Sequence, residues 1–216
     1  MKNTVIELIK EEKIIVIVRN VAREKLISLA QAMYNGGIRL LEITYSANED
    51  ISDAETALNI EMLSKHFNGR MCIGAGTVLN ETQVELTKKS GGQFIISPNT
   101  CENVIKKTCD LHMVSIPGAL TPSEIQAAHK YGADFVKLFP ITNMGKEYVK
   151  AVKMPLSHIN LLAVGGIDIH NLEDYLNVGI AGFGIGSNIV DKKLIDNNKF
   201  KEITELAQSY TRLIRK

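Results

Sequence analysis

Short runs of β-branched and aliphatic residues alternate with amphipathic stretches along the chain. In the amphipathic stretches the apolar residues recur at helical spacing, as Leu26, Leu29, Ala30 and Met33 do. Glycines follow several of these stretches, which is typical of helices that end in a left-handed cap. The pattern therefore predicts helices alternating with strands. The expected strands are residues 14–18, 38–44, 71–76, 93–97, 111–116, 160–164 and 180–185, together with the run around Lys137.

Strict alternation of strands and helices implies a parallel sheet with helical crossovers. Eight such units in 216 residues predict an α/β fold with a single domain over residues 1–216, a compact (β/α)8 TIM barrel. Residues 2–12 precede the first strand, and we expect them to form an extra N-terminal helix that covers the bottom of the barrel. A doubly wound open sheet is the alternative that the same alternation allows.

Charge and composition exclude several classes of function. A formal net charge of +1 gives no general attraction to nucleic acid or to acidic membranes. The three cysteines (Cys72, Cys101 and Cys109) lack the Cys-x-x-Cys spacing, which favours reduced thiols over disulfides or a zinc site. The five histidines show no ligand spacing, so no metal and no cofactor is expected. Without a signal-peptide core or an apolar run that could span a bilayer, the chain is predicted to be cytoplasmic.

Lys137 is the most unusual residue in the predicted strands. It lies in an apolar run that follows Gly132 and stops at Pro140. Strand side chains alternate between faces, so Lys137 shares its face with Phe135 and Phe139. A buried ammonium is costly unless it is paired or loses its proton, and a neutral lysine amine is a nucleophile toward carbonyl carbon. The run therefore indicates Schiff-base chemistry.

Glu42 is the carboxylate best placed to work with Lys137. It lies on the strand face of Leu40 and Thr44, and chemistry in such barrels is located at the C-terminal strand ends. An inward carboxylate beside a lysine could move the proton during carbinolamine formation and carbon–carbon cleavage. The alternative is a purely structural Glu42–Lys137 ion pair.

The ends of other predicted strands carry groups suited to binding an anion. Arg19 could hold a carboxylate by two parallel hydrogen bonds, although a surface arginine is an equal alternative. Thr77 follows Gly74-Ala75-Gly76, whose glycines allow a ligand close approach. Backbone N–H groups in the last two strand-end loops, Gly165-Gly166 and Gly186-Ser187, could bind a phosphate, as recurs in TIM barrels, although both loops could simply be tight turns.

Taken together, these motifs resemble those of one family in order and spacing. They are Ile-Val-Arg19, Leu-Glu42-Ile-Thr, Gly-Ala-Gly-Thr77, Ile-Ser-Pro98, Ile-Pro-Gly118, Val-Lys137-Leu-Phe-Pro, Val-Gly165-Gly166 and Gly186-Ser187. The chain resembles the 2-keto-3-deoxy-6-phosphogluconate (KDPG) aldolases, also called 4-hydroxy-2-oxoglutarate (KHG) aldolases, over roughly residues 5–210.

The resemblance implies a homotrimeric, metal-free class I aldolase. It implies cleavage of 2-dehydro-3-deoxy-6-phosphogluconate to pyruvate and glyceraldehyde 3-phosphate, and possible cleavage of 4-hydroxy-2-oxoglutarate to pyruvate and glyoxylate. Lys137 is then the Schiff-base lysine and Glu42 the proton-transfer carboxylate, working partly through water. The implied pyruvate pocket comprises Arg19, Thr77, Pro98 and Phe139, and the implied phosphate site comprises Gly165, Gly166, Gly186 and Ser187.

Two positions depart from the common family pattern. Many members carry an arginine four residues after the glutamate, where this chain has Ser46, and many have Pro-Thr before the Gly-Gly, where this chain has Ala163-Val164. These features, with Ser-Pro98-Asn99, resemble the branch that acts on 2-dehydro-3-deoxy-6-phosphogalactonate. A sugar-phosphate isomerase or epimerase, and a non-catalytic phosphosugar-binding barrel, are the alternatives from other classes.

Overall fold

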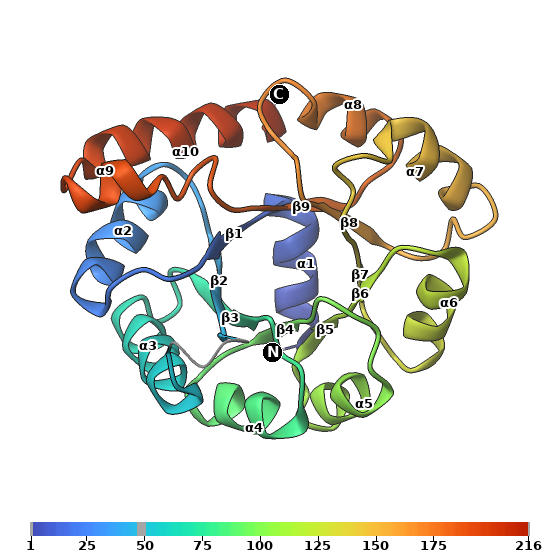
Figure 1. Ribbon diagram of the computed structural model, residues 1–216, viewed down its shortest axis with the longest axis horizontal. Coiled ribbons are helices and arrows are strands. Elements are labelled where there is room, and N and C mark those ends of the chain that lie inside the picture. Colours follow the sequence, from blue (N-terminus) through green and yellow to red (C-terminus); the bar gives the residue numbers. More distant parts are fainter. Residues whose placement is uncertain (1, 47–50, 216) are drawn as a thin grey trace.

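The computed structural model describes residues 2–46 and 51–215, and its strands form a ring surrounded by helices (Figure 1). The strands are β1 (Ile14–Val18), β2 (Leu40–Thr44), β3 (Cys72–Gly76), β4 (Phe94–Ile96), β5 (Val114–Ile116), β6 (Gly118–Ala119), β7 (Val136–Leu138), β8 (Leu161–Val164) and β9 (Gly182–Ile185). The helices are α1 (Lys2–Glu12), α2 (Arg23–Asn35), α3 (Asp53–His66), α4 (Glu81–Lys89), α5 (Glu102–Asp110), α6 (Pro122–Lys130), α7 (Gly145–Lys153), α8 (Leu172–Asn177), α9 (Lys192–Asp196) and α10 (Phe200–Ile214). The expected TIM barrel is confirmed.

The strand order is β5-β4-β3-β2-β1-β9-β8-β7-β6, and neighbouring strands in the described ranges pair in parallel. The structure divides the fifth of the eight expected strands at Pro117, because proline has no N–H to donate to a ladder. The two halves, β5 and β6, are consecutive in the chain and lie at the two ends of this order. Backbone bonds from Lys137 N to Pro117 O (2.8 Å) and from Asp134 N to Ser115 O (3.0 Å) close the ring between β5/β6 and β7.

Alternate residues of each strand point to opposite sides of the barrel wall. Leu40 and Phe135 pack in a buried cluster inside the barrel, whereas Leu41 and Val136 pack in a larger cluster between the strands and the outer helices. Since side chains two apart share a face, Glu42 and Lys137 point inward. The predicted strand parity is therefore confirmed.

Helix α1 fills one end of the barrel. Val5 and Ile9 of this helix join the inner cluster with Leu40 and Phe135, and Ile9 is fully buried. Figure 1 shows α1 within the ring of strands. As the first strands begin at this end, α1 closes the N-terminal end and leaves the C-terminal strand ends open, as expected for residues 2–12.

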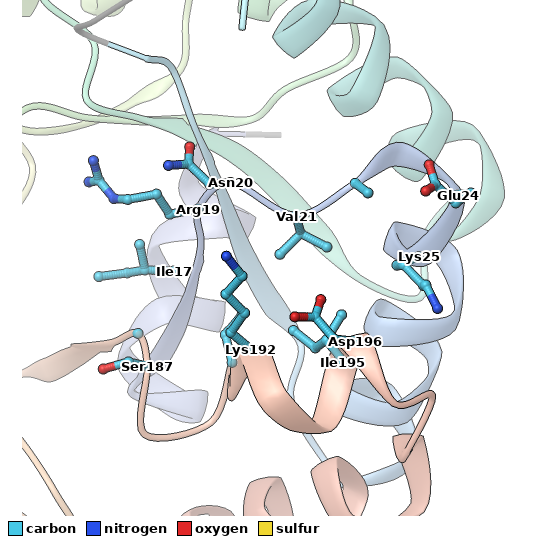
Figure 2. Close-up of a pocket in the computed structure, with 13 residues that line it drawn as sticks. Ile17, Arg19, Asn20, Val21, Glu24, Lys25, Ser187, Lys192, Ile195 and Asp196 are labelled. Carbon is cyan, nitrogen blue, oxygen red and sulfur yellow. The ribbon is translucent and has the colours of Figure 1, made fainter. Parts of the chain in front are cut away.

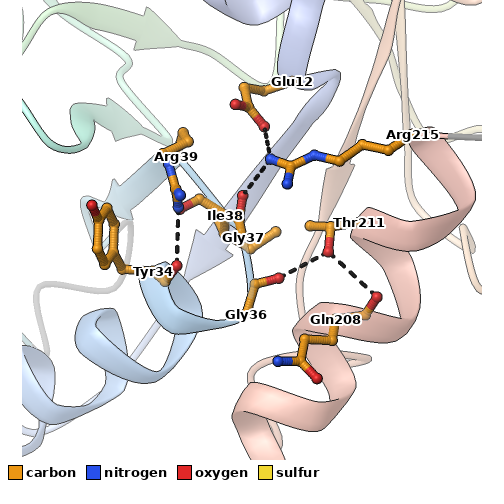
Figure 3. A network of polar contacts seen from close by, with 9 residues as sticks. All are labelled: Glu12, Tyr34, Gly36, Gly37, Ile38, Arg39, Gln208, Thr211 and Arg215. Atoms are coloured by element: carbon orange, nitrogen blue, oxygen red, sulfur yellow. Dashed lines mark hydrogen bonds and ion pairs between the residues drawn. The ribbon is translucent and has the colours of Figure 1, made fainter.

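The last helix, α10, and the residue after it contact the C-terminal ends of α2 and α1. Thr211 of α10 donates a hydrogen bond of 2.8 Å to the carbonyl of Gly36, just after α2, and Arg215 contacts Glu12 of α1 at 3.1 Å. Figure 3 shows this network joining three helices. No helix in the described ranges is both long and apolar enough to cross a lipid bilayer.

Candidate active site

Glu42 and Lys137 enter the barrel from opposite walls. Strands β1, β9 and β8 separate β2 from β7 on one side of the ring, and β3, β4 and the divided β5/β6 separate them on the other. Both side chains are buried, with 2% of Glu42 and 7% of Lys137 exposed. Between these two described residues the structure records neither a hydrogen bond nor an ion pair. The geometry therefore disfavours a structural ion pair and leaves both groups available to a ligand.

Burial is the main influence on the protonation of the pair. It raises the pKa of Glu42, against the opposing effect of the Lys137 and Arg19 charges. It lowers the pKa of Lys137, an effect that Glu42 opposes and Arg19 reinforces. Each group is therefore shifted toward its neutral form. A lysine so shifted offers more free amine for attack on a carbonyl, and a carboxyl group so shifted keeps its proton to a higher pH and can act as a proton donor.

Arg19 and Thr77 meet at the C-terminal ends of β1 and β3. Arg19 Nη2 donates a hydrogen bond of 3.1 Å to Thr77 Oγ1. The Thr77 backbone has φ of +55°, a left-handed conformation that is rare for a β-branched residue. Such strain is concentrated at functional sites, where the surrounding structure maintains it. The Arg19 guanidinium is close enough to Glu42 and Lys137 to affect both pKa values, and it is hydrogen-bonded to the Thr77 hydroxyl.

Phe139 and Pro98 line the surroundings of Lys137. The Lys137 amine lies 4.5 Å from the centroid of the Phe139 ring. Gly118 pairs with Lys137 across β6 and β7, and a Cβ at Gly118 would lie 2.3 Å from the Pro98 carbonyl oxygen. The Pro98 backbone therefore lies against Gly118, which is on the strand next to that of Lys137. Only a glycine at position 118 allows this close approach.

The two glycine loops lie at the same end of the barrel. Gly165 and Gly166, with φ of +95° and +72°, pack against Thr142, and a Cβ on Gly165 would be 3.7 Å from Phe139. Asn188 follows Gly186-Ser187 and donates a hydrogen bond of 2.8 Å to the Ile167 carbonyl. This bond links the loop after β9 to the loop after β8, which fixes one loop relative to the other.

A cavity of 610 Å³ opens between the ends of β1 and β9 and the helices α2 and α9. Figure 2 shows Arg19 and Ser187 on its inner side and Glu24 and Lys25 farther out. Of the residues predicted from sequence, Arg19, Gly186 and Ser187 line this cavity. Arg19 connects it to the buried pair, through Thr77 and through its effect on both pKa values.

Sequence reasoning missed three residues at this end of the barrel, namely Thr142, Asn188 and Lys192. Thr142 supports the Gly165-Gly166 turn, Asn188 links the two loops, and Lys192 lines the cavity. The position of Asn188 directly after Gly186-Ser187 was the only available signal for it. In the described part of the chain, no group of three or more histidine, cysteine, aspartate or glutamate residues could hold a metal ion.

Comparison with known proteins identifies the family. The model for KDPG and KHG aldolases matches residues 5–206. The chain belongs to the KDPG and KHG aldolase family. It is therefore a class I aldolase, a carbon–carbon lyase. This family assignment confirms the resemblance seen in the motifs. It excludes assignment to the isomerase, epimerase and non-catalytic classes.

Curated relatives of this aldolase cover most of its length. It is 32% identical over 213 residues to the 2-dehydro-3-deoxy-phosphogluconate aldolase of Haemophilus influenzae, which covers 98% of this chain and 97% of that protein. It is 31% identical over 177 residues to the 2-dehydro-3-deoxy-6-phosphogalactonate aldolase of Escherichia coli, covering 82% of this chain and 83% of the relative.

A solved structure shares the fold of this aldolase. It is the KDPG aldolase of Legionella pneumophila with pyruvate captured at low pH as a covalent carbinolamine intermediate. The two chains are 28% identical, with a TM-score of 0.84, and the match covers 94% of this chain and 96% of the other.

Proposed function

We propose that this aldolase cleaves 2-dehydro-3-deoxy-6-phosphogluconate to pyruvate and glyceraldehyde 3-phosphate through a Schiff base on Lys137. The observation that carries the proposal is the inward pair of Glu42 and Lys137, both buried and not paired with each other. Cleavage of 4-hydroxy-2-oxoglutarate to pyruvate and glyoxylate uses the same chemistry, because the reacting carbons are the same in both substrates.

The first half of the reaction forms the imine. The neutral Lys137 amine attacks the C2 carbonyl carbon of the substrate to give a carbinolamine, which loses water to form an iminium ion. Protonated Glu42 donates the proton that the leaving hydroxyl needs and is left as a carboxylate. Arg19 and Thr77 hold the substrate carboxylate, and the Phe139 ring packs beside the reacting nitrogen.

The second half breaks the carbon–carbon bond. The Glu42 carboxylate, directly or through a water molecule, takes the proton of the C4 hydroxyl. The C4 oxygen forms the aldehyde, the C3–C4 bond breaks, and its electron pair moves through C2 to the iminium nitrogen to give an enamine. Glu42 returns the proton to C3, and water hydrolyses the resulting pyruvate imine. Gly165, Gly166, Gly186 and Ser187 hold the phosphate throughout.

Borohydride trapping tests the role of Lys137. Incubation with pyruvate and sodium borohydride is expected to reduce the imine and add the pyruvate carbon skeleton to the Lys137 peptide, as measured by mass spectrometry. Lys137→Met is the matched variant, since methionine fills a similar volume without an amine. A folded wild-type protein that traps no pyruvate would overturn the Schiff-base proposal, as would equal trapping by Lys137→Met.

The galactonate-derived epimer is the second candidate substrate. Val164, which directly precedes Gly165, is buried and offers no hydroxyl to the substrate, and Ser46 stands where many members have an arginine. The 31% identity to the Escherichia coli 2-dehydro-3-deoxy-6-phosphogalactonate aldolase also supports it. Pyruvate release coupled to lactate dehydrogenase, with both epimers and 4-hydroxy-2-oxoglutarate as substrates, ranks the candidates by kcat/KM.

A homotrimer is the assembly that we propose, and it rests on the family resemblance alone. Light scattering coupled to size-exclusion chromatography tests it directly. A particle with the mass of three chains supports the trimer, and a particle of one or two chains contradicts it.

A further inference from the structure

The cavity beside the barrel mouth contains a lysine that the proposed mechanism does not use. Lys192 is the first residue of α9, and it lines the same cavity as Arg19, Gly186 and Ser187. Figure 2 shows its extended side chain beside the end of β1, with the amine directed toward the loop at Asn20 and Val21. A lysine in this position can meet a ligand that extends out of the barrel.

The Lys192 amine is free in the described structure. No hydrogen bond or ion pair is recorded for it, although Asp196 lies one turn away on the same helix. Lys25, the other lysine that lines the cavity, donates a hydrogen bond to Asn198. A flexible ammonium without a partner at the edge of a concave site is suited to binding an anionic group of a ligand.

Charge differs between the two ends of this cavity. Glu24 lies at the outer end together with Lys25, whose amine is engaged by Asn198, and Asp196 lies between them and Lys192, so the two carboxylates would repel an anion there. Arg19 and Ser187 lie on the inner side, where Arg19 faces the substrate carboxylate, and the Ser187 hydroxyl and the backbone of the Gly186 loop remain for the distal anionic group. An anionic group of the ligand is therefore favoured at the inner end, and the Lys192 stem can bring its amine there by rotation about its own bonds.

We propose that Lys192 is a specificity-determining residue that binds the anionic distal group of the substrate. It favours long phosphorylated keto-deoxy acids over the short, unphosphorylated 4-hydroxy-2-oxoglutarate. This inference rests on the aldolase function proposed above. The size of the cavity supports it, because 610 Å³ lies within the range of roughly 300–1,000 Å³ typical of sites for ligands much larger than pyruvate.

The contribution of Lys192 adds to that of the glycine loops. Backbone N–H groups bind phosphate in a fixed geometry, whereas a lysine supplies a mobile point charge that is partly screened by solvent. Removing this charge is expected to weaken substrate binding without stopping catalysis. The loss of the Lys192 charge is therefore expected to raise KM, and to do so only for substrates that carry a phosphate.

Steady-state kinetics of Lys192→Met test the inference. KM for the phosphorylated substrate is expected to rise roughly five- to tenfold, with kcat changed by less than about twofold, the size of one exposed charge-assisted contact. KM for 4-hydroxy-2-oxoglutarate is expected to stay within about twofold of the wild-type value, because that substrate has no phosphate and its second carboxylate is bonded directly to C4, close to the reacting carbons. Lys192→Arg is expected to restore most of the loss, because it keeps the positive charge.

Lys193→Met is the matched control. Lys193 is the next residue of α9 and is exposed, but it does not line the cavity. If Lys193→Met raises KM for the phosphorylated substrate as much as Lys192→Met does, the effect is one of general surface charge and the inference is wrong. An unchanged KM in Lys192→Met also overturns it.

Two further measurements separate this inference from the proposed function. Inorganic phosphate is expected to inhibit the wild type competitively, and its inhibition constant is expected to rise in Lys192→Met and to stay unchanged in Lys193→Met. Pyruvate trapping by borohydride needs no phosphate, and it is expected to be equal in all of these variants. If trapping fails in the wild type, the aldolase mechanism is wrong; if trapping succeeds and the phosphate constant is unchanged, only the role of Lys192 is wrong.

Discussion

Gly76 and Glu42 lie so close together that any side chain at position 76 would displace the Glu42 carboxylate. A Cβ built on Gly76 would lie 1.6 Å from Oε1 of Glu42 and 2.5 Å from its Cγ. The two residues are on neighbouring strands, where Gly76 pairs with Thr44 at the end of β3. The absent side chain provides the space that the Glu42 carboxylate occupies, so this glycine positions the proton-transfer group that we propose.

Gly76→Ala is therefore expected to move the Glu42 carboxylate and to reduce activity strongly. A forced fit in a packed interior typically costs about 1–3 kcal/mol of stability. We expect a loss of that size in chemical denaturation, together with a fall in kcat. Gly69→Ala is the control, because its Cβ would meet nothing within 4 Å, although its φ of +73° also strains an alanine. Equal kcat values for the two variants would contradict the role assigned to Gly76.

The pKa of Lys137 is expected to shift in opposite directions when Glu42 or Arg19 is replaced by an uncharged residue. Glu42 raises this pKa and Arg19 lowers it. Glu42→Gln is thus expected to shift the titration of the amine to lower pH, and Arg19→Met to shift it to higher pH. Trace labelling with acetic anhydride as a function of pH, read by mass spectrometry, measures the free amine without requiring catalysis.

Exposed Lys193 serves as the internal reference in that experiment. Burial is the main cause of the lowered pKa of Lys137, so the titration midpoint of Lys137 in the wild type is expected to lie below the ordinary lysine value of 10.5. Both variants retain this burial. Shifts of the same sign in the two variants would show that their main effect is structural.

Glu42→Gln is expected to reduce kcat by about two to four orders of magnitude, the usual contribution of a positioned acid–base group. Glutamine has nearly the same shape but cannot exchange the proton. The enzyme-catalysed exchange of the pyruvate methyl protons with deuterated water, followed by NMR, measures the proton transfer at C3 alone. The rate of this exchange is expected to fall in parallel with kcat. Exchange at the wild-type rate would show that another group moves this proton.

Thr211→Val is expected to destabilise the fold without changing the chemistry. It removes the hydrogen bond to the Gly36 carbonyl and leaves that buried acceptor unsatisfied, which costs about 1–3 kcal/mol. Thermal and urea denaturation measure the loss, and kcat of the folded variant is expected to equal the wild-type value. Thr82→Val, at an exposed position on α4, is the control and is expected to change stability by less than about 0.5 kcal/mol.

The barrel and the direction of its inward side chains could be predicted from sequence because both depend on short-range periodicity. The two-residue alternation alone placed Glu42 and Lys137 inside. The spacing of Thr121, Pro122 and Glu124 is likewise typical of a capping box, which the structure has at the start of α6. The division of one strand into β5 and β6 was missed. Pro117 removes a ladder donor, and whether that breaks a strand depends on the partner across the sheet.

The functional roles assigned to the individual site residues remain predictions, although their relative positions are now defined. The sequence put Arg19 and Thr77, 58 positions apart, in one implied pocket but did not predict their direct hydrogen bond, and it gave no reason to connect Asn188 with Ile167. Lys192 was not distinguishable from its neighbour Lys193, because two adjacent lysines on a helix differ only in what their faces meet.

The sequence by itself determined the periodicity, the inward lysine and glutamate, and the resemblance to an aldolase family. These follow from local alternation and from motifs of a few residues each. Only the tertiary structure decided that Glu42 and Lys137 lie on opposite walls without pairing, that Gly76 provides the space for the carboxylate, and that Lys192 lines the cavity while Lys193 does not. Ring closure brings distant segments to one end of the barrel, and packing there depends on distances that no local pattern contains.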